Sequence, residues 1–283
     1  MISRDPSTAA ARFRDIISRS EEEIDVAEAA LLIAKNNYAD LDVERYLARI
    51  QALGGELANR LTLSVSAEER IRALNRFLFE EQGFAPNVED YYDPRNNFLN
   101  EVLERRLGIP ISLSILYIEI GRRIGLALTG VSFPGHFLVK CKLQQGTVVL
   151  DPYCAGRSLS FEDLQQRLRE VRGGEVSRAI VAGLLVSANK KEILARMLRN
   201  LKVTYLEQGN RERALSMMEW IVTLSPADAA EVRDRGLLYR ELECFRAALG
   251  DFERYMDLAP LADDAERIRG YVIELQRTVG RLN

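Results

Sequence analysis

The sequence predicts an α+β fold, in which a small antiparallel sheet lies between a helical N-terminal region and a C-terminal α-solenoid of two helix-pair units. Three observations predict it. Apolar residues recur at helical spacing in the first part of the chain, short apolar strands replace that pattern around residues 131–151, and a repeat runs through the C-terminal part. We therefore expect three regions, at residues 1–82, 83–188 and 189–283.

The N-terminal region, residues 1–82, carries the signals of several helices. Ser20 precedes three glutamates, which is typical of an N-cap followed by acids in the first turn. Asp40 can cap a second helix over residues 41–53, and the pair Gly54-Gly55 is expected to end it. Ser66 precedes a third apolar stripe, which predicts another helix, and is expected to cap it.

The middle region is expected to contain a buried central helix. A helix is predicted from about residue 98 to 106, and Pro110 then opens another over residues 111–124, since proline is tolerated at the first helical position. The second of these helices is apolar on most of its sides, which indicates burial on all faces. Farther on, Ser160 is expected to cap a helix over residues 161–171.

The only histidine, His136, begins the first of two predicted apolar strands, which cover residues 136–142 and 147–151. A turn of even length between the strands pairs positions of opposite parity, so His136 and Asp151 should point to the same face. A carboxylate beside an imidazole fixes its tautomer and stabilises its cation, as in a catalytic triad. A lone histidine among apolar residues is also commonly structural, and Asp151 would equally suit a turn.

The C-terminal region contains an internal repeat with an offset of 34 residues. The repeated pairs are Tyr205 and Tyr239, Ala214 and Ala248, Met218 and Phe252, Leu224 and Leu258, and Pro226 and Pro260. This offset is the tetratricopeptide period, so we expect two such units followed by a capping helix over residues 263–282. The concave face would carry Lys202, Arg235 and Arg240, which could bind acidic groups of a partner.

Composition limits the function classes. The 283 residues carry a net charge of −3, with a pI near 5.6, which argues against a surface that neutralises nucleic-acid phosphates. No signal peptide and no membrane-spanning apolar run are predicted, and three unpaired cysteines suit the reducing cytoplasm. One histidine with scattered cysteines, and no glycine-rich phosphate loop, predict neither a metal nor a cofactor. The oligomeric state stays open.

Four stretches together resemble the SirB family, bacterial proteins that have a transglutaminase-like core and C-terminal tetratricopeptide repeats. The stretches run from Tyr92 to Leu99, from Arg106 to Ser114, from Phe133 to Phe137 and from Leu150 to Pro152. The resemblance covers roughly residues 20–275. It implies a papain-like core in which a central helix packs on an antiparallel sheet.

The resemblance also implies where a catalytic triad would lie. The wider transglutaminase-like superfamily uses a Cys-His-Asp triad whose cysteine begins the central helix, where the helix dipole favours a thiolate. His136 and Asp151 match the second and third members. The cysteine position falls at or next to Pro110, and no cysteine precedes Cys141. This favours a non-catalytic module that binds a protein or peptide through the core cleft and the repeats.

Other interpretations remain open from the sequence. Ser112 or Ser114 could replace the cysteine and make a hydrolase or acyltransferase with His136 and Asp151, which the distance from a serine Oγ to His136 Nε2 would decide. Buried helical serines commonly bond back to the backbone instead. In a third interpretation, the histidine–aspartate pair only stabilises the fold and the repeats form a homodimer surface.

Overall fold

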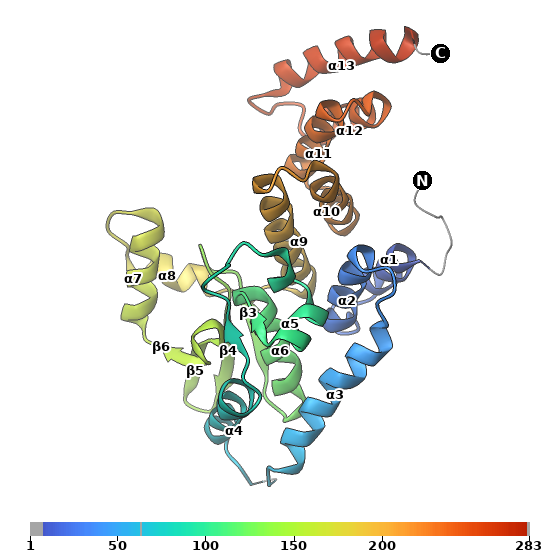
Figure 1. The fold of residues 1–283 in the computed structure, drawn as a ribbon. Coiled ribbons are helices and arrows are strands. Elements are labelled where there is room, and N and C mark those ends of the chain that lie inside the picture. The colour runs from blue at the N-terminus through green and yellow to red at the C-terminus, as the bar shows by residue number, and fades with distance from the viewer. Residues whose placement is uncertain (1–7, 63, 282–283) are drawn as a thin grey trace. The chain divides into compact units, whose positions relative to one another are not determined.

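The computed structural model describes residues 8–62 and 64–281, and these fall into two compact units, Met1–Met197 and Leu198–Asn283 (Figure 1). The first unit contains helices and a small antiparallel sheet, and the second is wholly helical. The predicted α+β class with a helical C-terminal region is therefore confirmed. In the described residues, no helix combines the length and apolar character that crossing a bilayer requires.

The first unit begins with four α-helices and a π-helical turn. Their bounds are α1 Ala9–Ser18, α2 Val26–Asn37, α3 Val43–Asn59, α4 Ala67–Asn75 and η1 Arg76–Glu81. The prediction for Ser66 is confirmed, because its hydroxyl accepts from the Glu69 amide while the Glu69 carboxylate accepts from the Ser66 amide.

Three expectations in this region are wrong. Residues 20–23 form a turn, and α2 begins later because the side chain of Asp25 caps it by accepting from the Glu28 amide. Asp42, and not Asp40, caps α3, because its side chain accepts from the Arg45 amide. Gly54-Gly55 does not end α3, which continues to Asn59. A Cβ at Gly54 would lie only 2.3 Å from Cδ of Arg123, so this glycine allows close packing against another helix rather than a C-cap.

The central helix of the first unit is α6, Pro110–Arg123, and its prediction is confirmed. It follows η2 Pro94–Asn96, α5 Leu99–Arg105 and a short parallel pair, β1 Ala85–Pro86 with β2 Leu107–Gly108. Almost every residue of α6 is buried, and the helix packs on strands of the sheet and on α3. Pro110 occupies its first position, where a missing amide hydrogen costs no helical bond.

Four antiparallel strands form the sheet in the order β3-β4-β5-β6. Their bounds are β3 Leu128–Val131, β4 Leu138–Leu143, β5 Gly146–Asp151 and β6 Arg157–Leu159. A two-residue turn joins β4 to β5, with Leu143 paired to Gly146, so the expected opposite parity is confirmed. The strand begins at Leu138 and not at His136, because a turn at Pro134-Gly135 (φ +69° at Gly135) precedes it.

After the sheet, the chain forms the short helix η3 Pro152–Cys154 between β5 and β6, then α7 Phe161–Arg172 and α8 Arg178–Leu184. Ser160 caps α7 by accepting from the Asp163 amide, as predicted. Leu164 and Leu168 of α7 pack with sheet residues such as Val149 in one apolar cluster. This packing holds α7 beside the end of β5, where the candidate site lies.

The repeat predicts the helix boundaries of the second unit well. The helices are α9 Lys190–Glu207, which begins in the first unit, α10 Arg211–Leu224, α11 Ala229–Glu241, α12 Phe245–Leu258 and α13 Ala265–Arg281. The ends of α9 and α11, and both ends of α10 and α12, differ by the predicted 34 residues. Most of the expected core residues are buried: Tyr205, Ala214, Met218, Ala248 and Phe252, with Tyr239 partly buried.

Candidate functional site

The imidazole of His136 and the carboxylate of Asp151 lie side by side. Nε2 of His136 is 2.8 Å from Oδ1 of Asp151, well within the distance for strong charge coupling, so the predicted pairing is confirmed. The turn before β4 carries the histidine and the last residue of β5 carries the aspartate. The aspartate side chain is fully buried, whereas the histidine side chain keeps 15% of its surface exposed. The ring is thus the accessible member of the pair.

Two further donors hold the Asp151 carboxylate. Its Oδ1 also accepts from the amide of Tyr153 at 3.1 Å, and its Oδ2 accepts from Nη2 of Arg167 at 2.5 Å. Burial raises the pKa of Asp151, but the hydrogen bond and charge of His136, together with Arg167, outweigh burial and lower it to about 2. Arg167, on α7, was missed by the sequence analysis because a single arginine on an amphipathic helix gives no signal of its partner.

Aromatic rings extend from the imidazole to solvent. The ring of Tyr153 lies edge-on to His136 with centroids 5.7 Å apart, and Tyr91 lies edge-on to Tyr153 at 6.3 Å. Tyr92 continues the series at 5.3 Å from Tyr91. Tyr91 and Tyr92 are 38% and 58% exposed, so the histidine borders an exposed aromatic surface. We call Tyr91, Tyr92 and Tyr153 the tyrosine cluster.

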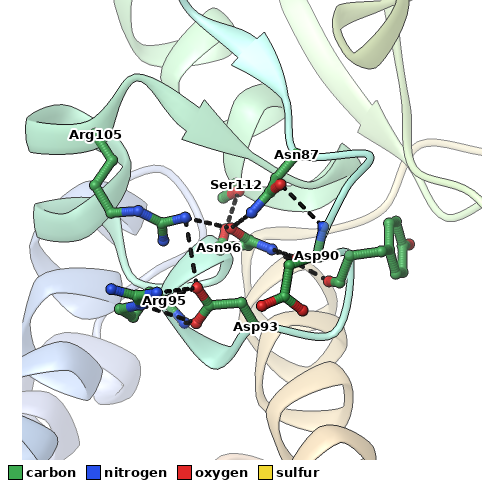
Figure 2. A network of polar contacts seen from close by, with 8 residues as sticks. Asn87, Asp90, Asp93, Arg95, Asn96, Arg105 and Ser112 are labelled. Atoms are coloured by element: carbon green, nitrogen blue, oxygen red, sulfur yellow. Dashed lines mark hydrogen bonds and ion pairs between the residues drawn. The ribbon is translucent and has the colours of Figure 1, made fainter.

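A buried polar network fixes the backbone that carries Tyr91 and Tyr92 of the tyrosine cluster (Figure 2). The fully buried Asn96 donates through Nδ2 to the carbonyls of Asp90, at 2.7 Å, and Tyr91, at 3.2 Å. Its Oδ1 accepts from Asn87 at 3.0 Å and from Arg105 at 3.3 Å. Because one buried amide bonds four neighbours, the loop over residues 87–96 is held in a defined shape.

The two serines considered as nucleophiles, Ser112 and Ser114, are buried in α6. Ser112 Oγ donates to the Asn96 carbonyl at 2.6 Å and accepts from the Ile109 amide at 3.1 Å, so it fastens the start of α6 (Figure 2). Ser114 Oγ is enclosed and has no partner in the described part of the chain. Within residues 8–62 and 64–281, neither serine hydrogen-bonds to His136. Nε2, the nitrogen expected to face a serine, faces Asp151 instead.

The start of α6 offers no cysteine. The helix η3, which follows Asp151 directly, contacts both α6 and β1, and β1 pairs with β2 just before Pro110. These contacts bring Asp151 to the end of α6 at which Pro110 stands. Of the cysteines, Cys141 is buried and Cys154 is exposed. Burial and the charge of Asp151 raise the pKa of Cys154 despite the nearby Arg167, so its thiol is not activated.

The described residues contain no group of three or more histidine, cysteine or acidic side chains that could hold a metal ion. The three basic residues expected on the repeats have acidic neighbours. Lys202 lies 2.7 Å from Glu231, and Arg235 bonds both oxygens of Asp251 at 2.7 Å. Arg240 is the most exposed of the three, at 35%, and lies 3.4 Å from Glu274. A partner's acids would therefore compete with existing ion pairs.

Comparison with known proteins agrees with this architecture. The profile of the transglutaminase-like superfamily matches residues 44–199, and a tetratricopeptide repeat profile matches residues 201–271. A UPF0162 protein of Xylella fastidiosa (strain Temecula1) is 39% identical over 93% of this chain and 94% of its own length. Protein SirB1 of Salmonella typhimurium is 29% identical over 80% and 82%, and the UPF0162 protein YchA of Escherichia coli is 27% identical over 84% and 87%.

Proposed function

The chain belongs to the SirB family, with a transglutaminase-like core and tetratricopeptide repeats, and from this premise we propose that the core is a non-catalytic recognition module. It binds a segment of a partner protein at the surface formed by His136 and the tyrosine cluster. Tetratricopeptide repeats commonly serve protein–protein interaction, which supports a protein as the partner. The three free cysteines suit action in the cytoplasm.

One observation carries the proposal: the histidine–aspartate pair is retained while the nucleophile position is not. Pro110 begins the helix and provides neither a nucleophile nor an amide donor. Ser112 is committed to backbone groups of the core, and Ser114 has no bond to the imidazole. Without an adjacent activated nucleophile, a covalent acyl-transfer mechanism has no first step in these residues.

The surface that remains is suited to recognition. Tyr91 and Tyr92 present rigid aromatic area, and tyrosine is enriched in protein interfaces because its ring buries apolar surface while its hydroxyl stays polar. Val88, on the same loop, is 71% exposed. The Asn96 network keeps this loop ordered before a partner arrives, which reduces the entropy lost on binding.

Photo-crosslinking tests the binding surface. We would replace Tyr92 with p-benzoylphenylalanine in the full chain, expose cells to ultraviolet light and identify adducts by mass spectrometry. One discrete protein adduct is expected, and Tyr91→Ala should reduce its yield severalfold, because Tyr91 lies between Tyr92 and the imidazole. The same amino acid at Val186, which is 69% exposed in the same unit, is the matched control and should not give that adduct.

A fluorophosphonate probe tests the competing enzyme hypothesis, because it labels activated serine hydroxyls. The purified chain is expected to show no labelling of Ser112 or Ser114 above that of denatured protein. Stoichiometric labelling of either serine that is lost in His136→Ala would overturn the non-catalytic proposal. Equal crosslinking from positions 92 and 186 would instead remove the proposed binding surface.

A further inference from the structure

A cavity lies in the first unit, formed by residues other than those of the histidine site. It has a volume of about 320 Å³, at the lower end of the range for small-molecule sites. It opens between α6, β3, the segment before α2 and the start of α9. Its apolar walls are Val26, Ile115, Ile118, Leu128 and Ile193.

One buried carboxylate gives this cavity a polar end. The side chain of Glu119 is 5% exposed, and its Oε2 accepts from Arg122 at 2.6 Å and from Arg123 at 3.1 Å. Its Oε1 receives no hydrogen bond from the described residues and keeps some exposed surface. Glu119 lines the cavity, and of its two carboxylate oxygens this is the one that the arginines leave unused. A buried carboxylate oxygen gains most from a charged donor.

The lining of the cavity carries three carboxylates and two cations. Glu21 and Glu22 line it together with Glu119, against the two cations Arg122 and Lys190. Both cations are already engaged, and of the carboxylates Glu21 accepts from the Lys190 amide at 2.6 Å. The Lys190 ammonium donates at 2.7 Å to the carbonyls of Glu22 and Ile24, and the Arg122 guanidinium bonds Glu119. What the cavity still offers is acceptor capacity beside apolar walls, which suits an ammonium group on an apolar body.

We propose that this cavity binds a primary ammonium attached to an apolar side chain, as in an apolar α-amino acid or the N-terminal residue of a peptide. The ammonium donates to Oε1 of Glu119, and the side chain packs between Ile115, Ile118 and Ile193. The site draws on none of the residues of the proposed recognition surface. Its success or failure in experiment is therefore independent of that function.

A fluorine NMR titration of the full chain tests this site with 4-fluoro-L-phenylalanine as the probe. Saturable broadening or shift of the fluorine signal is expected. The N-acetyl derivative, which lacks the ammonium, should bind at least tenfold more weakly. The tripeptide 4-fluorophenylalanyl-glycyl-glycine separates the two sources: binding of the tripeptide but not of the free amino acid assigns the site to peptide N-termini, and the reverse assigns it to free amino acids.

Two variants connect the signal to the cavity. Glu119→Gln should weaken the amine at least tenfold and leave the N-acetyl compound unchanged. Thr129→Trp, at an exposed strand residue that lines the cavity, should fill its mouth and abolish binding. Thr147→Trp, at an exposed strand residue outside the lining, is the matched control and should bind as the unaltered chain does. If Glu119→Gln does not fold, the comparison of Thr129→Trp with Thr147→Trp still tests whether the amine binds in this cavity.

Absence of saturable binding by both amines up to their solubility limits would overturn the proposal. So would equal affinities for the amine and its N-acetyl derivative, because the Glu119 oxygen would then play no part in recognition. Binding that survives Thr129→Trp unchanged would show that the amine occupies another site.

Discussion

Asp151→Asn should destabilise the core by about 2 kcal/mol at neutral pH. The pKa of Asp151 is about 2, against an ordinary value of 3.8, because His136 and Arg167 outweigh the effect of burial. A difference of one unit between folded and unfolded pKa corresponds to about 1.4 kcal/mol of stability, which gives the expected magnitude. The change keeps the shape of the side chain while it removes the charge that both partners require.

The pH dependence of this loss has a defined sign. A carboxylate whose folded pKa is depressed stabilises the fold fully above its unfolded pKa, and the contribution disappears as pH falls through the folded value. The difference between the unaltered chain and Asp151→Asn should therefore be fully present at about pH 5. It should shrink from about pH 4 toward pH 2, where the carboxylate of Asp151 becomes protonated.

Hydrogen exchange of the β4 and β5 amides is the appropriate assay, because it reports the free energy of opening of that sheet. Tryptophan fluorescence is unsuitable here, since the only tryptophan, Trp220, lies in the second unit. Asp90→Asn is the matched control, since its exposed carboxylate makes no ion pair within the described ranges. A loss below about 0.5 kcal/mol at pH 7, or an equal loss at pH 3, would refute the reasoning.

Three further predictions concern other parts of the chain. Gly236→Ala should destabilise the repeats by about 1–3 kcal/mol, because the new Cβ would lie 2.8 Å from the ring of Phe252; an unchanged denaturation midpoint by Trp220 fluorescence would contradict this. Cys154 should react slowly with iodoacetamide at pH 7, because burial and the neighbouring carboxylate raise its pKa; a rate above that of a free thiol would be inconsistent with that environment. Ser66→Ala should cost about 1 kcal/mol through loss of the capping box, seen as faster amide exchange in the first turn of α4; unaltered exchange would show that the cap is dispensable.

Much of the fold could be predicted because its signals are local or periodic. The 34-residue repeat predicted the second unit because each helix pair repeats the same packing, so α10 and α12 begin and end at equivalent positions. The pairing of His136 with Asp151 followed from strand alternation and an even turn. Both predictions depend on regular spacings in the chain whose geometry allows few alternatives.

The features that were missed depend on contacts between distant elements. Arg167 reaches Asp151 only because α7 packs beside the sheet, and nothing near it in sequence marks it as a partner of a carboxylate. Glycine is common at helix ends, but Gly54 instead allows a close helix–helix contact. The charges of Lys202 and Arg235 indicated a binding face, whereas pairing with acids of the neighbouring helices engages them. Such pairings can be recognised only when the positions of the helices in the fold are known.

In the function we propose, the arrangement around the start of α6 lets the His136–Asp151 pair serve recognition. Where the superfamily nucleophile would stand, Pro110 closes the helix start, and Ser112 ties it to the carbonyl of Asn96. Asn96 in turn holds the backbone of Tyr91. On the other side, the Asp151 carboxylate accepts from the amide of Tyr153 while it orients the imidazole. These bonds fix the rings beside His136, so in the function we propose the His136–Asp151 pair positions a binding surface.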